Sequence, residues 1–175
     1  LASTFDKSFT FTLPTFNDTL VEGSESFTVV ASNAVVSNGA SATAGGSVLT
    51  TITDNDTLAL SLTGDTVVAE GGAPSYTLAI TSGQIPVGST ATVDLSITLP
   101  GGLTGAEAPD FIESFLKDLQ DAAETGVTVG TANTVANVTT VGLTLASTFD
   151  GNFTFTLPTF NDTLVEGSES FTVVA

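Results

Sequence analysis

Hydrophobic and polar residues alternate along most of this chain. Threonine, serine and aspartate stand between the apolar positions, so each expected strand has one face to bury and one face for solvent. Turn signals such as Gly71-Gly72 and Ser82-Gly83 separate the alternating runs at short intervals. The clearest runs cover residues 58–62, 76–80, 93–99, 153–157 and 171–175. This pattern predicts an all-β, immunoglobulin-like sandwich.

One segment has a helical period instead. In PDFIESFLKDLQDAAETG the apolar residues recur every three or four positions, which gives a single apolar stripe. Pro109 suits the first helical turn, Asp110 suits the positive N-terminal end, and Gly126 suits a left-handed C-cap. We therefore expect one inserted α-helix over about 109–125, packed on the sandwich. A membrane-facing or partner-facing helix is the alternative, and its acidic face disfavours anionic lipid.

The chain also contains an internal repeat. Residues 1–31 return as residues 145–175, so the period is 144 residues and the chain covers one period plus an overlap. Two positions differ between the copies, Lys7/Gly151 and Ser8/Asn152. Folding constraints alone hardly maintain such near-identity, so we interpret the chain as cut from a longer tandem array. The alternative is one domain in which the two similar segments pair with each other.

The repeat predicts two domains. We expect residues 1–56 to be the C-terminal part of one repeat and residues 57–175 to be most of the next. The second unit then lacks its final strand, the counterpart of 48–52, and keeps an open apolar edge. Open edges recruit strands from elsewhere. We expect a neighbouring copy to supply this strand, either along one continuous chain or by strand exchange between subunits, in a head-to-tail fibre.

Composition restricts the function. Of 175 residues, 19 are acidic, two are lysine and none is arginine or histidine, for a formal net charge of −17. Such a charge excludes nucleic acid as a natural partner. Without histidine or cysteine the chain lacks the commonest general base, zinc ligands and thiol nucleophile, so we expect no enzyme. Paired carboxylates can hydrolyse glycosides, but these acids lie in turns and the chain has no tryptophan. No apolar run approaches the length of a membrane span, and we expect no membrane insertion.

The acidic residues group in turns. The motif NDTLVEGSE follows the strand end PTF in both copies, TDND at 53–56 closes the strand VLTTI, and Glu70 lies in VVAEGG. This pattern resembles the Calx-β family. The repeats of that family begin with a V-x-E-G-like turn, carry an Asp-Tyr pair in mid-domain, pass through an acidic D-x-x-x-E-G-x-E corner and end in I-T-D-N-D. The resemblance covers nearly the whole chain and is nearest to the tandem repeats of very long bacterial surface proteins and adhesins.

The resemblance implies a calcium site at one end of each sandwich. In the first repeat the implied ligands are Asp18, Glu22, Glu25, Asp54 and Asp56; in the second they are Glu70, Asp110, Asp162, Glu166 and Glu169. Calcium binds six to eight hard oxygen ligands, and carboxylates gathered without a cation repel one another. The sequence departs from the family pattern at Asp110-Phe111, which stands in place of Asp-Tyr, and at Asn17 and Asn55, where richer sites have acids. The alternative is that these acids only solvate turns.

Two classes of function follow from these expectations. The first is a structural repeat of a long extracellular or cell-surface adhesin, stalk or matrix fibre, stiffened by Ca²⁺ where consecutive repeats meet. The second is an extracellular module that recognises a protein or glycan through its loops or edge strands. Near-identical copying favours the first class, because a recognition tip usually differs from its shaft.

Overall fold

The computed structural model describes residues 8–98, 107–157, 159 and 170–175, with only the backbone for residues 107–110. In these ranges the chain forms β1 (Glu25–Val30), β2 (Ser47–Ile52), β3 (Ala59–Gly64), β4 (Ser75–Ser82), β5 (Thr90–Thr98), α1 (Glu107–Ala122), β6 (Val127–Val135), β7 (Val138–Ala146), β8 (Asn152–Thr156) and β9 (Thr172–Val174). The expected all-β fold with one inserted helix is therefore confirmed. No helix within the described residues is long and apolar enough to cross a membrane.

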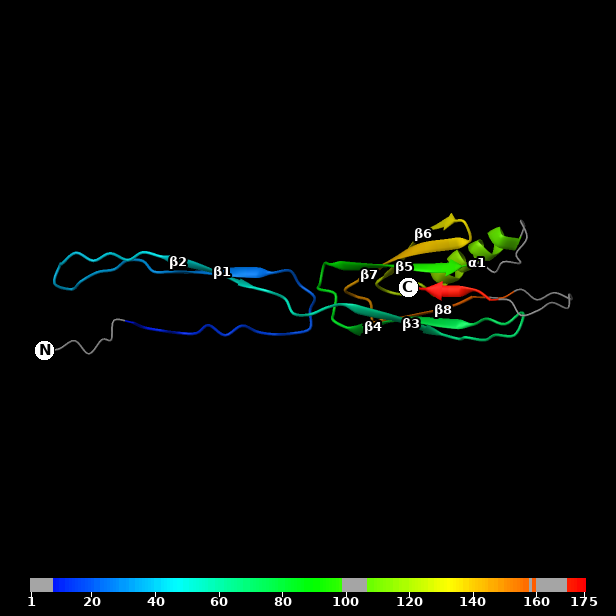
Figure 1. Cartoon of the computed structure of the whole chain (residues 1–175), viewed down its shortest axis with the longest axis horizontal. Coiled ribbons are helices and arrows are strands. Elements are labelled where there is room, and N and C mark those ends of the chain that lie inside the picture. Colours follow the sequence, from blue (N-terminus) through cyan, green and yellow to red (C-terminus); the bar gives the residue numbers. More distant parts are fainter. Residues whose placement is uncertain (1–7, 99–106, 158, 160–169) are drawn as a thin grey trace.

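Strands β3 to β9 form two antiparallel sheets around one core (Figure 1). One sheet has the order β3-β4-β8 and the other has the order β6-β7-β5-β9. Alternate residues of β7 and β8 point into the core, among them Leu143, Leu145, Phe153 and Phe155, while most of their neighbours stay partly or fully exposed. The period of two in the sequence thus gives each strand its buried face. These two packed sheets confirm a β-sandwich.

Helix α1 completes the core, although its ends differ from the expected 109–125. It begins two residues earlier, at Glu107, and ends three residues earlier, at Ala122. Its apolar stripe is buried against the sandwich, with Phe115 and Leu119 fully enclosed. Gly126 has the positive φ expected of it, +88°, but it lies in the turn closed by the Val127 N–H and the Glu124 carbonyl. Its carbonyl accepts the N–H of Ala146 at 2.8 Å, which ties Gly126 to the following β-hairpin instead of the helix end.

The first copy of the repeated segment lies outside this sandwich. Strands β1 and β2 pair antiparallel from Glu25↔Ile52 to Val30↔Ser47 and form a separate two-stranded sheet. In Figure 1 this hairpin projects from the sandwich, and the chain before it runs alongside. The two copies do not pair with each other in the described residues, because β1 pairs with β2, β8 with β4 and β9 with β5. The alternative of a single domain closed by pairing of the two copies is therefore wrong for these strands.

Candidate acidic site at the base of the hairpin

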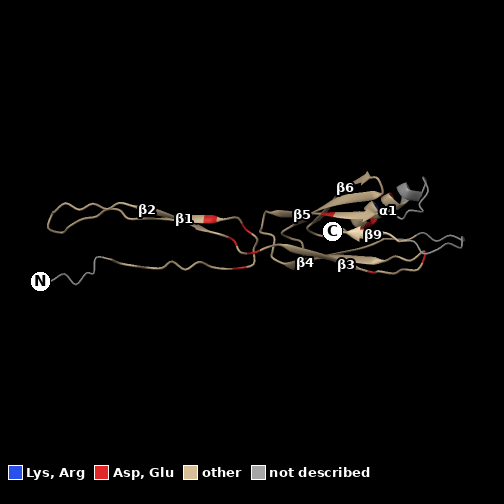
Figure 2. Cartoon of the chain, viewed as in Figure 1, with Lys and Arg blue, Asp and Glu red and all other residues tan. Residues whose placement is uncertain are grey.

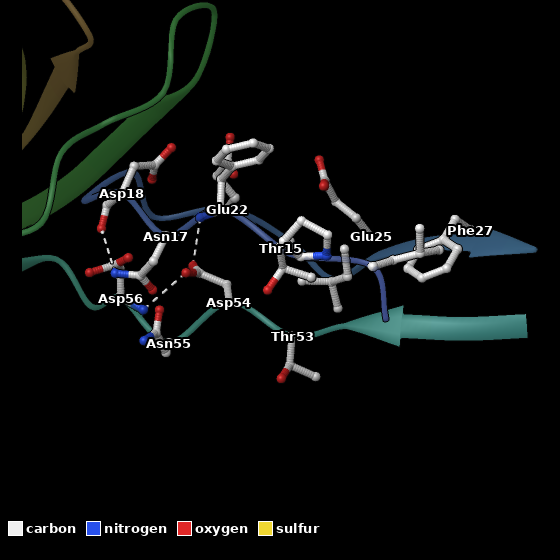
Figure 3. A pocket seen from close by; sticks show the side chains of 15 residues that line it. Thr15, Asn17, Asp18, Glu22, Glu25, Phe27, Thr53, Asp54, Asn55 and Asp56 are labelled. Carbon is white, nitrogen blue, oxygen red and sulfur yellow. Dashed lines mark hydrogen bonds between the residues drawn. The ribbon is translucent and has the colours of Figure 1, made fainter. Parts of the chain in front are cut away.

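A pocket at the base of the β1–β2 hairpin is lined by acidic side chains (Figure 3). Figure 2 shows acidic positions in red along the backbone at this end of the hairpin. The segment before β1 forms one wall, and the turn after β2 forms the other. All five acidic residues expected in the first repeat line this pocket: Asp18, Glu22, Glu25, Asp54 and Asp56. The hairpin explains their proximity, because antiparallel pairing of β1 with β2 brings the residues before one strand beside those after the other.

Backbone N–H groups hold two of these carboxylates in place. Asp54 accepts the N–H of Glu22 through Oδ2 at 2.7 Å and the N–H of Asp56 through Oδ1 at 2.9 Å. Asp18 accepts the N–H of Leu20 through Oδ1 at 2.8 Å. The bonds to Asp56 and Leu20 are local Asx-type turns, which aspartate favours because its short side chain reaches the backbone two residues on. The bond to Glu22 joins segments 32 residues apart in the chain.

The charges at this pocket affect Glu22 and Asp54 in opposite directions. Partial desolvation raises the pKa of Glu22, and the negative charges of Asp18, Glu25 and Asp54 raise it further. The hydrogen bonds from the backbone of Asp56 and Glu22 lower the pKa of Asp54. Glu22 therefore experiences the mutual repulsion of the cluster, whereas Asp54 is the anion that the backbone stabilises.

Several carboxylates line the pocket, but their oxygens do not point to one common centre. Within the described residues, no three carboxylates lie close enough together to hold a metal ion. Both oxygens of Asp54 face backbone N–H groups, and the carboxylate of Glu25 points away from Asp54 (Figure 3). The donor chemistry suits a hard cation such as Ca²⁺, but the observed rotamers do not form its coordination shell. Side chains such as Glu25 must turn inward before a cation can be bound.

The acids expected in the second repeat are only partly within the described residues. Glu70 lies exposed in the turn closed by the Gly72 N–H and the Ala69 carbonyl, at 2.9 Å. Thr159 joins this turn through its N–H and Oγ1, both of which donate to the carbonyl of Gly72. Asp110 lies in α1, but its side chain is outside the described part. Three further expected ligands are also outside it: Asp162, Glu166 and Glu169.

The end of β4 and the loop after it hold the acidic site against the sandwich, a role that sequence reasoning did not assign. The Val21 N–H donates to the carbonyl of Gln84 at 3.0 Å, and Leu20 and Gln84 form an isolated parallel bridge. Ser82 Oγ donates to the carbonyl of Thr57 at 3.0 Å. The Ser82-Gly83 turn signal was the available clue, but it carried no information on what the turn contacts. Hydrogen bonds thus join the sandwich to the chain both just before Glu22 and just after Asp56.

Comparison of the chain with protein-family models, with curated protein sequences and with solved structures found no match.

Proposed function

We propose that this chain is a structural repeat of a long extracellular bacterial adhesin, stalk or matrix fibre, built from immunoglobulin-like, Calx-β-like sandwiches in head-to-tail order. One observation carries the proposal. The sequence ESFTVVA occurs twice, and its two copies have complementary partners: Thr28–Val30 pair with β2, whereas Thr172–Val174 pair with β5. In a complete repeat, the ESFTVVA strand would have both partners at once, with β5 along one of its edges and a β2-type strand along the other.

The junction supports a stiff array. Residues 53–58 lead from β2 into β3, and none of them is glycine or proline. The connection therefore lacks the glycine-rich composition of a freely flexible linker. The hydrogen bonds of Thr57 with Ser82 and of Val21 with Gln84 hold the two segments against the end of β4 and the loop that follows it. A chain of repeats joined in this way gains length with each copy and little flexibility. Repetition of nearly identical units suits a shaft better than a recognition surface.

Calcium is the proposed stiffening ligand at each junction. One period, residues 32–175, contains 15 acidic residues and a single lysine, Lys117. Self-repulsion of this charge opposes compaction. A divalent cation near Asp54 and Glu22 offsets it at the place where desolvation, and then the negative charges of Asp18, Glu25 and Asp54, raise the pKa of Glu22. A cation that binds only the folded state also stabilises it, by about 2.7 kcal/mol at a hundredfold excess over Kd.

The test uses a chain of three consecutive periods. Small-angle scattering and electron microscopy should show a rod whose length increases with the number of periods, and its thermal midpoint should be higher in calcium than in chelator. The matched control carries Asp54→Asn, Asp56→Asn and Glu22→Gln in every period, which removes charge from the acidic site with little change in side-chain size. Equal midpoints of the unmutated chain in calcium and chelator would contradict the calcium site. A flexible or collapsed particle would contradict the shaft and favour a recognition module.

A further inference from the structure

The two copies of the sequence FTFTL have opposite environments. In the second copy this sequence is β8 with the residue that follows it, and its apolar side chains lie in the core. In the first copy the same side chains face solvent. The exposed fractions are 80% for Phe9 against 0% for Phe153, 56% for Phe11 against 1% for Phe155, and 53% for Leu13 against 1% for Leu157.

The burial of the second copy depends on β4. Phe155 pairs with Tyr76 in the ladder, and their rings stack with centroids 5.6 Å apart. On the solvent face, Thr77 and Thr154 pair and share a hydrogen bond between their Oγ1 atoms at 2.9 Å. Strand β4 therefore supplies both the ladder and an aromatic contact. The first copy has the same side chains and no ladder at residues 8–13 in the described structure.

The first copy already has the geometry of a strand. The rings of Phe9 and Phe11 stack with centroids 6.0 Å apart and planes 29° apart. The corresponding values for Phe153 and Phe155 are 5.7 Å and 28°. Residues two apart share a face only in an extended backbone, so the exposed segment presents the same apolar face as β8. Little further ordering is needed before it can pair.

We propose that residues 8–13 are a docking strand, and that its partner is β4 of a second copy of this chain. The docking strand takes the position of β8, with Phe11 opposite Tyr76, Thr10 opposite Thr77 and Phe9 opposite Leu78. This inference rests on the proposed tandem function and names the partner of its exposed half-repeat. It also assigns a register, because the pairs of β8 with β4 transfer directly to the identical sequence.

Charge favours this pairing over other associations of such an acidic chain. Residues 8–17 contain no Asp, Glu or Lys, and neither do residues 71–93, which include all of β4. Two copies can therefore meet here without placing carboxylates opposite each other, a pairing that destabilises a sheet. An exposed apolar strand with an unpaired backbone is also a ready template for a neighbouring strand.

In the copy that supplies β4, called the acceptor, β8 already occupies the edge of β4 that the docking strand would take. Both strands make the same contacts with β4, so these contacts favour neither of them. The tether favours β8, with an effective concentration of roughly millimolar for a short linker. Docking between separate chains should therefore be a minor state at low concentration and become dominant when β8 is weakened.

The experiment uses the full chain and its natural lack of cysteine. The acceptor carries Phe153→Ser, Phe155→Ser and Thr77→Cys, and the donor carries Thr10→Cys. The matched control donor carries Thr12→Cys, whose position faces the same side but lies roughly 7 Å along the strand, beyond the reach of a disulfide. Oxidation of the mixture should link positions 10 and 77 several-fold more than positions 12 and 77. Adding Phe9→Ser and Phe11→Ser to the Thr10→Cys donor should remove this preference.

A second pair of variants guards against an acceptor that does not fold. Two double variants keep Phe153 and Phe155: one carries Thr10→Cys and Thr77→Cys, and the other carries Thr12→Cys and Thr77→Cys. Each is refolded at high concentration and then oxidised. Thr77→Cys with Thr154→Cys should close within one chain and shows that the position can form a disulfide. Equal linking of positions 10 and 12 in both experiments would overturn the docking strand. If the two positions link equally but a chain of three periods forms a rod, only the docking strand is wrong. If positions 10 and 77 link preferentially but three periods form no rod, only the shaft is wrong.

Discussion

Asp54 closes the base of the β1–β2 hairpin by accepting the backbone N–H of Glu22 at 2.7 Å, although 32 residues separate them in the chain. Val21, the residue before Glu22, donates its N–H to the carbonyl of Gln84 in the loop after β4. Residues 21 and 22 therefore join two segments that are distant in the sequence, the turn at Asp54 and the loop after β4. The segment around Glu22 thus holds the junction together through its backbone N–H groups, in addition to contributing negative charge.

Asp54→Ala should loosen this junction. The substitution leaves the N–H groups of Glu22 and Asp56 without their carboxylate acceptor, so both amides should exchange with solvent faster. Hydrogen exchange followed by NMR measures this directly. Asn55→Ala in the same turn is the control and should leave both rates unchanged. Unaltered exchange in the Asp54→Ala chain would show that the carboxylate does not hold the turn.

Glu22→Gln should stabilise the chain at neutral pH. The pKa of Glu22 is raised from 4.5 by desolvation and by its acidic neighbours, so ionising it costs folding free energy. This cost is complete above the raised pKa and disappears as the pH falls to 4.5. The variant should therefore have a higher thermal midpoint than the unmutated chain at neutral pH and the same midpoint well below pH 4.5. A difference that is independent of pH would contradict the repulsion.

Asp54 should respond to acid in the opposite direction. Its pKa is lowered from 3.8 by backbone hydrogen bonds, so its contribution to stability is present above that value and is lost as the pH falls through the lowered pKa. In the Asp54→Asn chain the thermal midpoint should change less over this acid range than in the unmutated chain. Equal acid sensitivity of the two chains would show that Asp54 has no such role.

Gly83→Ala should disturb the junction more than Gly88→Ala does. Both glycines lie in the loop between β4 and β5 with positive φ, +73° and +84°, so both substitutions strain the backbone. A Cβ at Gly83 would lie 2.7 Å from the Thr57 carbonyl oxygen and 2.8 Å from Val21 Cγ2, whereas none of these contacts exists at Gly88. Thermal unfolding and exchange of the Val21 amide measure the difference. Equal effects of the two substitutions would exclude the close packing at Thr57.

Asp118→Asn should stabilise the sandwich at neutral pH. Asp118 lies near the C-terminal end of α1, and its Oδ2 is buried without a hydrogen-bond partner. Its pKa is raised from 3.8, first by desolvation and then by Asp121, against the lowering effect of Lys117. Removing the charge from the negative end of the helix should gain about 0.3–1 kcal/mol in the free energy of unfolding, and the gain should vanish below pH 3.8.

The control for this change is Asp121→Asn, one turn from Lys117. Asp121 forms an exposed ion pair with Lys117, so its substitution should give no gain. Urea unfolding at two pH values distinguishes the cases. A gain of equal size in both variants would indicate a general effect of charge on the chain and not the buried oxygen of Asp118.

The sequence by itself determined the all-β character of the chain, the position of its one helix and the face that each predicted element has to bury. The alternation of apolar residues around Leu78, Leu95 and Phe153 predicted strands whose alternate side chains are now buried. The three- and four-residue spacing around Phe115 predicted the helix that covers the core. These patterns succeed because burying one face of a regular element is a local property of the chain. The proximity of the acidic residues at the hairpin base was implied by the Calx-β resemblance, and the pairing of β1 with β2 produces it.

Only the tertiary structure decided which equally apolar segments are buried. Phe9 and Phe153 stand in nearly identical sequences, and only Phe153 has β4 beside it. The place of Gly126 beside Ala146 and the attachment of Val21 to Gln84 likewise depend on partners remote in the chain. An apolar pattern determines the face that a strand must bury, but it contains no information on which strand lies next to it. Burial of that face depends on a neighbour whose position the local sequence does not specify.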